Sequence, residues 1–167
     1  MIEKEEVSTS LQILKILLED LEKKHGISPQ DAIRKAKGDE LLLPASIFVQ
    51  ELTVLEAVIK YLKEGQNYSL TKIAEFLKRK PRSIWGSYKS ASKKHPAQLP
   101  LDSNSILIPA KNFSHEILSP SEILVIYLKD NSSMRLSEIA KLLHKDSRTV
   151  WAQYSTGKKK MHREERK

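Results

Sequence analysis

Cysteine is absent from this chain of 167 residues, which excludes disulfide bonds, thiolate zinc sites and cysteine nucleophiles. The sequence also lacks an apolar run of about 18 residues, the length that a membrane-spanning helix needs, and its acidic start, MIEKEE, is unlike a signal peptide. Its five glycines are isolated, so no glycine-rich loop is available to cradle a phosphate, and its five histidines form no pair at metal-ligand spacing. We therefore expect a soluble cytoplasmic protein that is not an enzyme and needs no metal or cofactor.

What the sequence does contain is an internal repeat. Residues 41–94 return as residues 106–160, at an offset of 65 positions up to Leu52 and of 66 from Glu56 onward. Because a repeat fixes the architecture, the function of one unit is expected twice in the chain. The pairs that align without gaps include Leu62/Leu128, Leu70/Leu136, Ile73/Ile139, Ala74/Ala140, Leu77/Leu143, Arg82/Arg148, Trp85/Trp151 and Tyr88/Tyr154.

The excess of positive over negative charge lies in the part of the chain that contains the repeats. The chain carries a net charge of +8, and residues 1–40 contribute −2, whereas residues 41–100 and 101–167 contribute +6 and +4. A basic region beside an acidic one indicates a polyanionic partner, most simply nucleic acid. The alternative is an ordinary solvated surface rich in lysine.

Residues 1–40 are predicted to form a helical hairpin. Ser8 or Ser10 can cap a first helix that ends at Gly26, and Ser28 can cap a shorter second helix. The first helix carries an apolar stripe that packs either on the same chain or on a second copy, so this segment is a candidate for docking or homodimerisation. The stripe consists of Leu11, Leu14, Leu18 and Leu21, widened by Ile13 and Leu17.

Each repeat is predicted to contain an extended apolar segment, ending in Pro44 or Pro109, and then three helices. The clearest helix start combines Ser119 as the cap with Glu122 at the reciprocal capping position. The predicted fold is therefore all-α, with two tandem three-helix units preceded by the N-terminal hairpin. The expected domains are the hairpin 1–40, the first repeat 41–96, a linker 97–104, the second repeat 105–160 and a disordered charged tail 161–167.

The last two helices of each repeat share the pattern L-x-x-I-A-x-x-L, six residues, then [IV]-W-x-x-Y. In the second of these helices, Ile84, Tyr88 and Ala91 fall on one face. The small side chain of Ala74 or Ala140 allows the two helices to cross closely. Close crossing after a tight turn is the physical basis of a helix-turn-helix.

The segment Leu136-Ser137-Glu138-Ile139-Ala140 resembles the helix-turn-helix of sigma-factor region four and of response regulators. Ser83-Ile84 and Thr149-Val150 fit the second half of that pattern. Lys78-Arg79 and His144-Lys145 stand where the pattern has a glycine and an apolar residue, so we expect the turn to be built differently.

The resemblance implies that the third helix of each unit enters the major groove of DNA. An arginine at the start of this helix is suited to a bidentate contact with guanine or to a phosphate. Gly86 and Ala152 leave room for the backbone to approach a groove, although the alternative is that Gly86 only weakens its helix. Gln153 and Ser155 can hydrogen-bond base edges. The residues expected to face DNA are Arg82, Gly86, Lys89 and Lys93, and Arg148, Ala152, Ser155 and Lys159.

Trp85 and Trp151 lie at the edge of the inward face. Each either packs against the first helix and Tyr61 or Tyr127, or contacts a sugar, a thymine methyl group or an unstacked base. Several basic side chains are expected to contact phosphates without reading sequence. These are Lys78, Arg79, Lys80, Lys94, Lys145, Lys158 and Lys160.

These observations predict a nucleoid-associated protein that binds double-stranded DNA, a transcription regulator with two heads in adjacent major grooves. The ten residues between Lys94 and Ser105 can stretch to about 33 Å, close to the ~34 Å of one DNA turn. The alternatives are a non-specific architectural DNA-binding protein, an interaction module that docks on the transcription machinery, and an RNA-binding protein.

Overall fold

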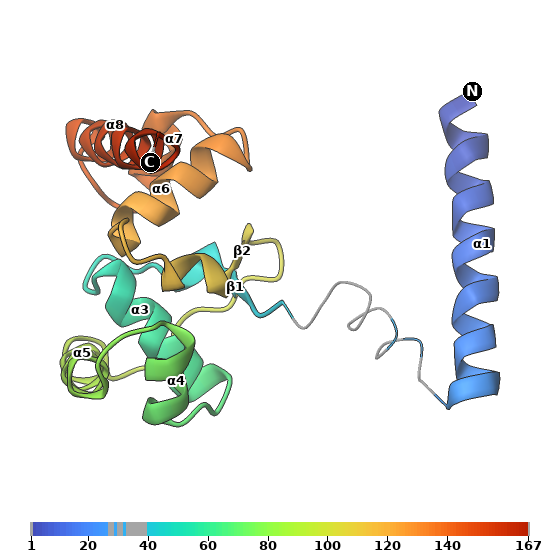
Figure 1. The fold of residues 1–167 in the computed structure, drawn as a ribbon, viewed down its shortest axis with the longest axis horizontal. Coiled ribbons are helices and arrows are strands. Elements are labelled where there is room, and N and C mark those ends of the chain that lie inside the picture. Colours follow the sequence, from blue (N-terminus) through green and yellow to red (C-terminus); the bar gives the residue numbers. More distant parts are fainter. Residues whose placement is uncertain (1, 27–28, 30–31, 33–39, 167) are drawn as a thin grey trace. The chain divides into compact units, whose positions relative to one another are not determined.

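The structure is a computed structural model that describes residues 2–26, 29, 32 and 40–166. It divides into two compact units, Met1–Glu40 and Leu41–Lys167, which are described separately (Figure 1). The fold is mostly helical, as predicted. Among the described residues, no helix is both long enough and apolar enough to cross a membrane.

The first unit contains the helix α1, Ile2–His25. It begins before Ser8 and Ser10, so the predicted caps are wrong. Gly26 does end the helix, with a φ of 63° and an N–H that donates to the carbonyl of Glu22 at 3.0 Å. The second helix of the predicted hairpin lies outside the described residues, apart from two isolated helical positions.

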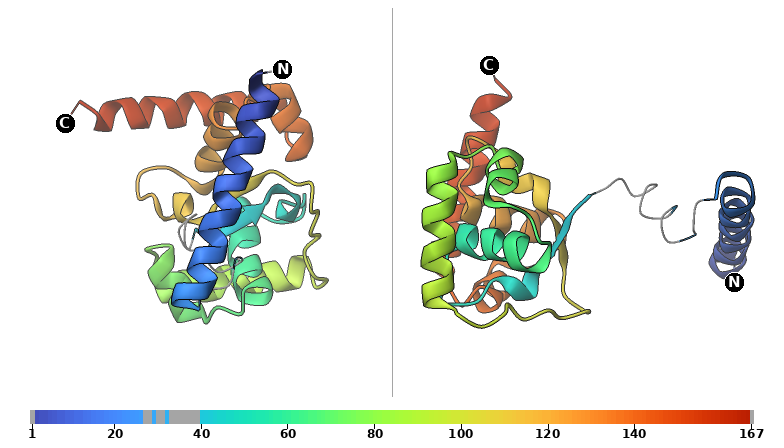
Figure 2. Two further views of the ribbon diagram at one scale, coloured as in Figure 1. Left: turned by 90° about the vertical axis from the view of Figure 1, so that its right-hand side faces the viewer. Right: turned by 90° about the horizontal axis from the view of Figure 1, so that it is seen from below.

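The second unit contains both repeats, each with a short strand followed by helices. The last helix, α8 (Ser147–Glu164), extends past the body of the unit (Figure 2), so the prediction of a disordered tail 161–167 is wrong for most of that segment. Met161 packs against the core, which supports this added helical turn. The elements are β1 (Leu42–Pro44), the 3₁₀ turn η1 (Ala45–Ile47), α3 (Val54–Lys60), the π-helical turn η2 (Tyr61–Gly65), α4 (Leu70–Phe76), α5 (Pro81–Lys94), β2 (Leu107–Pro109), the 3₁₀ turn η3 (Ala110–Ser114), α6 (Pro120–Asp130), α7 (Leu136–Leu142) and α8 (Ser147–Glu164).

Local capping fixes where the first helix of each repeat begins. The Ser119 hydroxyl accepts a hydrogen bond from the Glu122 N–H at 3.3 Å, and the Glu122 carboxylate accepts one from the Ser119 N–H at 2.8 Å. Thr53 and Glu56 make the same reciprocal pair in the first repeat. The predicted capping box at Ser119 is therefore confirmed.

The two repeats pair through equivalent residues. β1 and β2 are antiparallel, and Leu43 lies opposite Ile108, its own counterpart in the repeat. The Ala45 N–H donates to the Ile106 carbonyl at 2.8 Å, and the counterpart Ala110 N–H donates to the Leu41 carbonyl at 2.7 Å. Because exchanging the repeats returns the same set of contacts, the interface has an approximate two-fold axis.

Apolar side chains extend this interface into a single core. Phe48 and its counterpart Phe113 have ring centroids 6.3 Å apart, and α3 contacts α6. Buried residues of both repeats belong to one continuous cluster, and Figure 1 shows the helices of the two repeats on either side of the strands. The repeats are thus halves of one compact unit.

The segment 97–104 is packed against the first repeat. Leu99 is buried, and the Ser46 hydroxyl donates to the Pro100 carbonyl at 3.0 Å and accepts from the Asp102 N–H at 3.1 Å. This segment is therefore not the extended connection that was expected to let the units reach adjacent major grooves. The shared core holds the repeats together instead.

Candidate nucleic-acid interface

The last two helices of each repeat cross closely at a small residue. Ala74 and Ile84 are buried where α4 meets α5, and Ala140 and Val150 are buried where α7 meets α8. As the motif predicted, a larger side chain at either alanine would separate the two helices. The short connection then turns the second helix outward.

The turn between these helices is closed by backbone hydrogen bonds. The Arg79 N–H donates to the Ala74 carbonyl at 2.9 Å, and the Lys78 N–H donates to the Glu75 carbonyl at 3.1 Å. These two bonds form a Schellman motif, in which the residue after the helix adopts a left-handed conformation. Lys78 has a φ of 51°, and its counterpart His144 has a φ of 50°.

The expectation that this turn differs from that of the pattern stays a prediction. Lys78 and His144 adopt the backbone conformation that glycine favours, at a steric cost that the two hydrogen bonds and the helix packing offset. Both side chains are exposed, so neither crowds the core.

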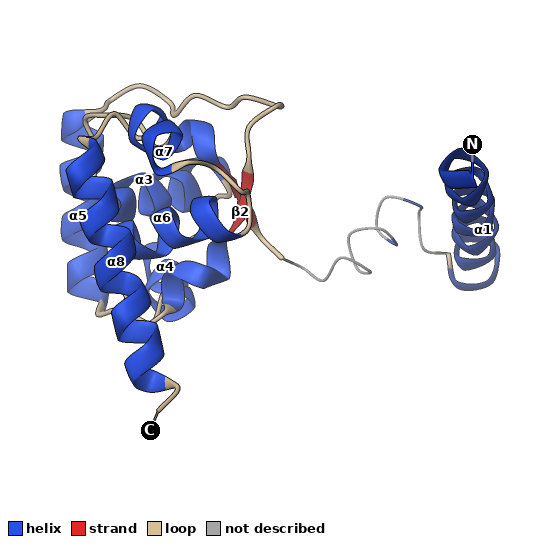
Figure 3. Ribbon diagram, turned by 90° about the horizontal axis from the view of Figure 1, so that it is seen from above, coloured by secondary structure: helices blue, strands red, loops and turns tan. Residues whose placement is uncertain are grey.

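The helices α5 and α8 lie on the same face of the second unit. Figure 1 shows both nearly end-on at one side of the unit, α8 above and α5 below, and Figure 3, seen from above, shows both along that same side. Tyrosines fix the rotation of each helix about its own axis. The Tyr88 hydroxyl donates to Glu64 at 3.2 Å, and the Tyr154 hydroxyl donates to Asp130 at 2.8 Å.

With the tyrosines turned inward, the predicted outward residues face solvent. Nine of the ten residues assigned to the two outward helices are exposed, whereas Ser155 is only partly so. Gln153 is half-buried and its Oε1 is buried without a hydrogen-bond partner, so its expected contact with a base edge is not supported. The exposed residues are Arg82, Trp85, Gly86, Lys89, Lys93, Arg148, Trp151, Ala152 and Lys159.

The two tryptophans are among the most exposed apolar side chains of this face. Trp85 is 55% exposed and Trp151 is 60% exposed, so the interpretation that they pack inside the unit is wrong. The Nζ of Lys89 lies 5.1 Å from the ring centroid of Trp85, within the range of a cation–π contact. A basic group and an aromatic ring are thus presented together.

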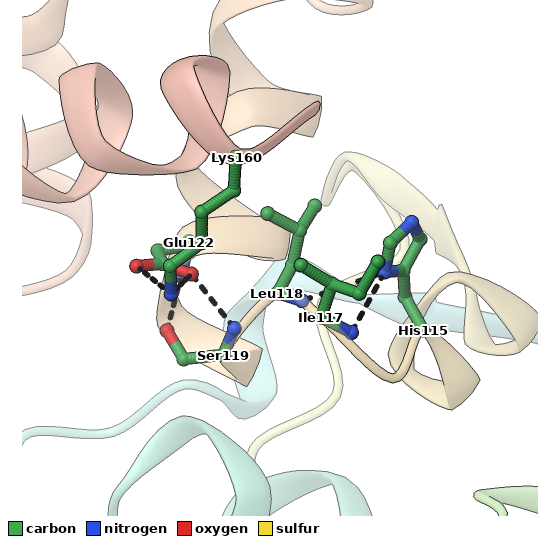
Figure 4. Close-up of polar contacts among 6 residues, drawn as sticks. All are labelled: His115, Ile117, Leu118, Ser119, Glu122 and Lys160. Atoms are coloured by element: carbon green, nitrogen blue, oxygen red, sulfur yellow. Dashed lines mark hydrogen bonds and ion pairs between the residues drawn. The ribbon is translucent and has the colours of Figure 1, made fainter. Parts of the chain in front are cut away.

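Three lysines expected to contact phosphates hold carboxylates of this chain instead. Lys94 Nζ lies 2.8 Å from Glu56 Oε1, Lys158 Nζ lies 3.1 Å from Asp130 Oδ2, and Lys160 Nζ lies 2.9 Å from Glu122 Oε1 (Figure 4). Each carboxylate belongs to the first helix of its repeat. The lysines therefore attach α5 and α8 to that helix, and we revise their assignment accordingly.

Both buried carboxylates of these pairs, Glu56 and Glu122, have a lowered pKa. Burial raises the pKa of Glu56, but hydrogen bonds from Lys94, Ser90 and Thr53 outweigh it and lower the pKa to about 2. In the second repeat, burial also raises the pKa of Glu122. Hydrogen bonds from Ser119 and Lys160 outweigh this effect and lower the pKa.

Tyr154 and Lys158, in the middle of α8, have pKa shifts in the opposite direction. The hydrogen bond to Asp130 is the main cause that raises the pKa of both Tyr154 and Lys158. Lys158 thus keeps its charge beside the acidic group.

The remaining predicted phosphate contacts lie at the turns before α5 and α8. Lys78, Lys80 and Lys145 are exposed, whereas Arg79 is half-buried with its Nε lacking a hydrogen-bond partner. Together with Arg82 and Arg148, they put basic groups at the start of each outward helix.

Sequence reasoning missed the close approach at Gly157. A Cβ at this position would lie 2.6 Å from Ile126 Cδ1, because α8 packs tightly on α6 there. The available signal was its alignment with Ala91, the small residue on the inward face of α5.

Within the described residues, no group of three or more histidine or acidic side chains is arranged to hold a metal ion. Comparisons with protein-family models, with curated proteins and with solved structures found no match to this chain.

Proposed function

We propose that this chain binds double-stranded DNA and regulates transcription, with α4/α5 and α7/α8 acting as two helix-turn-helix pairs. In this proposal α5 and α8 are the recognition helices. Trp85, Lys89 and Arg82 contact DNA from the first, and Trp151, Arg148 and Lys159 from the second.

The observation that carries this proposal is the shared face of α5 and α8. Both helices expose a basic and aromatic surface on one side of the second unit, while their lysines on the inner side are neutralised by carboxylates. A duplex is long enough to be contacted by both helices at once. Arginine and lysine there would release counterions from the duplex, which favours association.

The close helix crossing and the tight turn support the same function. They hold a solvent-exposed helix at a fixed angle to its neighbour, which a helix needs if it is to enter a groove. Gly86 and Ala152 lie in the middle of the outward surfaces and carry little or no side chain, so the helix backbone can approach a groove there.

A titration of a labelled random duplex tests this proposal. We expect binding whose affinity falls steeply as salt concentration rises. The double variant Arg82→Ala/Arg148→Ala is expected to bind about tenfold or more weakly. The matched control Lys63→Ala/Lys129→Ala removes the same charge from η2 and α6. Duplex affinity no better than that of an acidic control protein would refute the proposal.

Two related functions remain to be separated from this one. A non-specific architectural protein would use the same faces but give no consensus in a random-site selection. RNA binding would show as equal or tighter affinity for single-stranded or duplex RNA in the same titration.

The exposed apolar residues of α1 favour a second interaction, with another protein chain. Leu11 is 60% exposed, Leu14 is 45% exposed and Leu17 is 56% exposed, so the described residues of the first unit leave the apolar stripe uncovered. We propose that α1 pairs with α1 of a second copy, with a transcription protein as the alternative partner. Val7, Leu11, Leu14, Leu18 and Leu21 follow the alternating four- and three-residue spacing of a helix pair.

A further inference from the structure

We propose that the DNA site of this protein consists of two unequal half-sites in inverted orientation at a fixed spacing. This inference rests on the proposed function, but its evidence is the interface between the repeats. It concerns which duplexes are bound, and it can fail while DNA binding itself holds.

The inverted orientation follows from the two-fold axis. Leu43 opposite Ile108, the paired hydrogen bonds of Ala45 and Ala110, and the contact between the Phe48 and Phe113 rings all join equivalent positions. A tandem arrangement related by translation would join unlike positions instead. The axis therefore carries the α4/α5 pair onto the α7/α8 pair.

A duplex has its own local two-fold axes, perpendicular to the helix axis. Two heads related by a two-fold axis meet the duplex in equivalent ways only when the two axes coincide, and each head then reads the opposite strand. Two-fold related heads accordingly favour inverted half-sites over direct repeats. Here both heads belong to one chain, so the symmetry needs no second copy.

The reading surfaces are related but not identical. The helix starts are alike, since Arg82 and Trp85 have the counterparts Arg148 and Trp151. The outward positions in the middle of the two helices differ. Lys89 of α5 is a long cation, whereas its counterpart Ser155 of α8 is shorter and half-buried. We therefore expect half-sites that share the bases read at the start of each helix and differ at those read farther along.

The spacing between half-sites is set by the core. The strands and the buried side chains of both repeats join the heads, and the segment 97–104 is fixed by Ser46 and by the burial of Leu99. A longer connection at the exposed Asn104 would leave this interface unchanged. The heads therefore cannot adjust to half-sites placed farther apart.

Random-site selection with the full-length protein, followed by binding measurements, tests this inference. The selected sites are expected to contain an imperfect inverted repeat. Reversing one half-site to make a direct repeat at the same spacing is expected to reduce affinity at least about tenfold, the cost of roughly one lost base contact or more. Inserting five base pairs between the half-sites is expected to have a similar effect.

Two variants sharpen the test. In Gly86→Ala/Lys89→Ser, α5 takes the residues of α8 at two outward positions, and we expect the preference to shift toward a perfect inverted repeat of the half-site read by α8. An insertion of six Gly/Ser residues before Asn104 is expected to leave the preferred spacing unchanged.

The outcomes separate the two proposals. Absence of duplex binding would contradict both the proposed function and this inference. Binding with a direct repeat, with no consensus, or with a spacing that follows the length of segment 97–104 would overturn the inference alone.

Discussion

Lys94 Nζ contacts both carboxylate oxygens of Glu56, at 2.8 and 2.9 Å, across 38 residues of chain. Lys160 and Glu122 repeat this contact at the same separation, with both distances at 2.9 Å. In each repeat the pair joins the first helix to the outward helix. A buried carboxylate held in this way links the stability of the unit to pH.

We expect the second unit to lose stability in acid through these carboxylates. The pKa of Glu56 is about 2 in the folded protein and 4.5 in its ordinary state, so its contribution is complete above the ordinary value and is lost as pH falls toward 2. The Glu56→Gln variant should lose on the order of 2 kcal/mol at neutral pH and show a flatter stability curve between pH 5 and 2 in denaturant unfolding.

The control for this experiment is Glu75→Gln, which changes an exposed glutamate of α4. Its curve is expected to parallel that of the unmodified protein. An unchanged slope in Glu56→Gln would show that Glu56 does not account for the acid lability.

Trp85 and Trp151 are the only tryptophans in the chain, and both lie on the outward helices. We expect duplex DNA to change their intrinsic fluorescence, because binding would remove the exposed indoles from water. Trp85→Ala and Trp151→Ala should each weaken binding about tenfold, the order of one lost base contact. Thermal unfolding should change little, since exposed positions contribute about 0.5 kcal/mol or less. Equal fluorescence with and without a bound duplex would contradict this placement.

Lys78 and His144 carry a left-handed backbone that glycine adopts without a steric cost. Lys78→Gly and His144→Gly should each raise the free energy of unfolding by about 0.5–1 kcal/mol, because relief of the strain exceeds the entropy that glycine adds to the unfolded chain. Chemical denaturation measures this change. Lys78→Gly and Lys78→Asn both keep the turn and remove the charge, so a loss of duplex binding shared by the two variants would report the charge and not the turn.

The glycines of the outward helices give a matched pair of substitutions. Gly157→Ala should destabilise the protein by about 1 kcal/mol, because the new Cβ would lie 3.2 Å from Glu122 Cβ, next to the backbone of α6, and 2.6 Å from the flexible end of Ile126. Gly86→Ala meets no atom within 4 Å and should stabilise the helix, by about 0.5–1 kcal/mol. Thermal unfolding of the two variants should therefore shift in opposite directions, and shifts of the same sign would contradict the packing described for α8.

Self-association through α1 is testable by light scattering. The full chain is expected to form a dimer, whereas residues 41–167, which form a compact unit of their own, should be monomeric. Leu14→Asp should weaken the dimer because Leu14 lies on the stripe. Ile16→Asp is the control, since this exposed residue lies on another face of the helix. A monomeric full chain would contradict the pairing of α1.

Much of the local structure could be predicted because its signals lie within a few residues. Ser119 with Glu122 marks the start of α6, and Pro81 marks the start of α5. The inward set of α5 also followed from helical spacing. The start of α1 could not be predicted in the same way, because two serines offered caps inside a helix that had already begun.

Sequence reasoning could predict which residue types form the candidate site, but not which of its lysines are held by carboxylates of the same chain. The exposure of Arg82 and Lys89 followed from the positions of Ile84 and Tyr88. Lys94 lies on the same helix and is equally basic, yet it is held by Glu56 from an element far away in the sequence. No local pattern distinguishes a lysine that meets such a carboxylate from one that faces solvent.

Three properties could be read from the amino-acid order alone: a helical unit occurs twice, most of its helices begin at recognisable residues, and certain side chains of the last helix face away from its core. These properties depend on spacing along one helix and on caps a few residues away. Only the tertiary structure decided that the two copies meet through Leu43 and Ile108 about a two-fold axis. That pairing depends on the fit of surfaces 65 residues apart, and the same repeat is compatible with separate units or with a translated array.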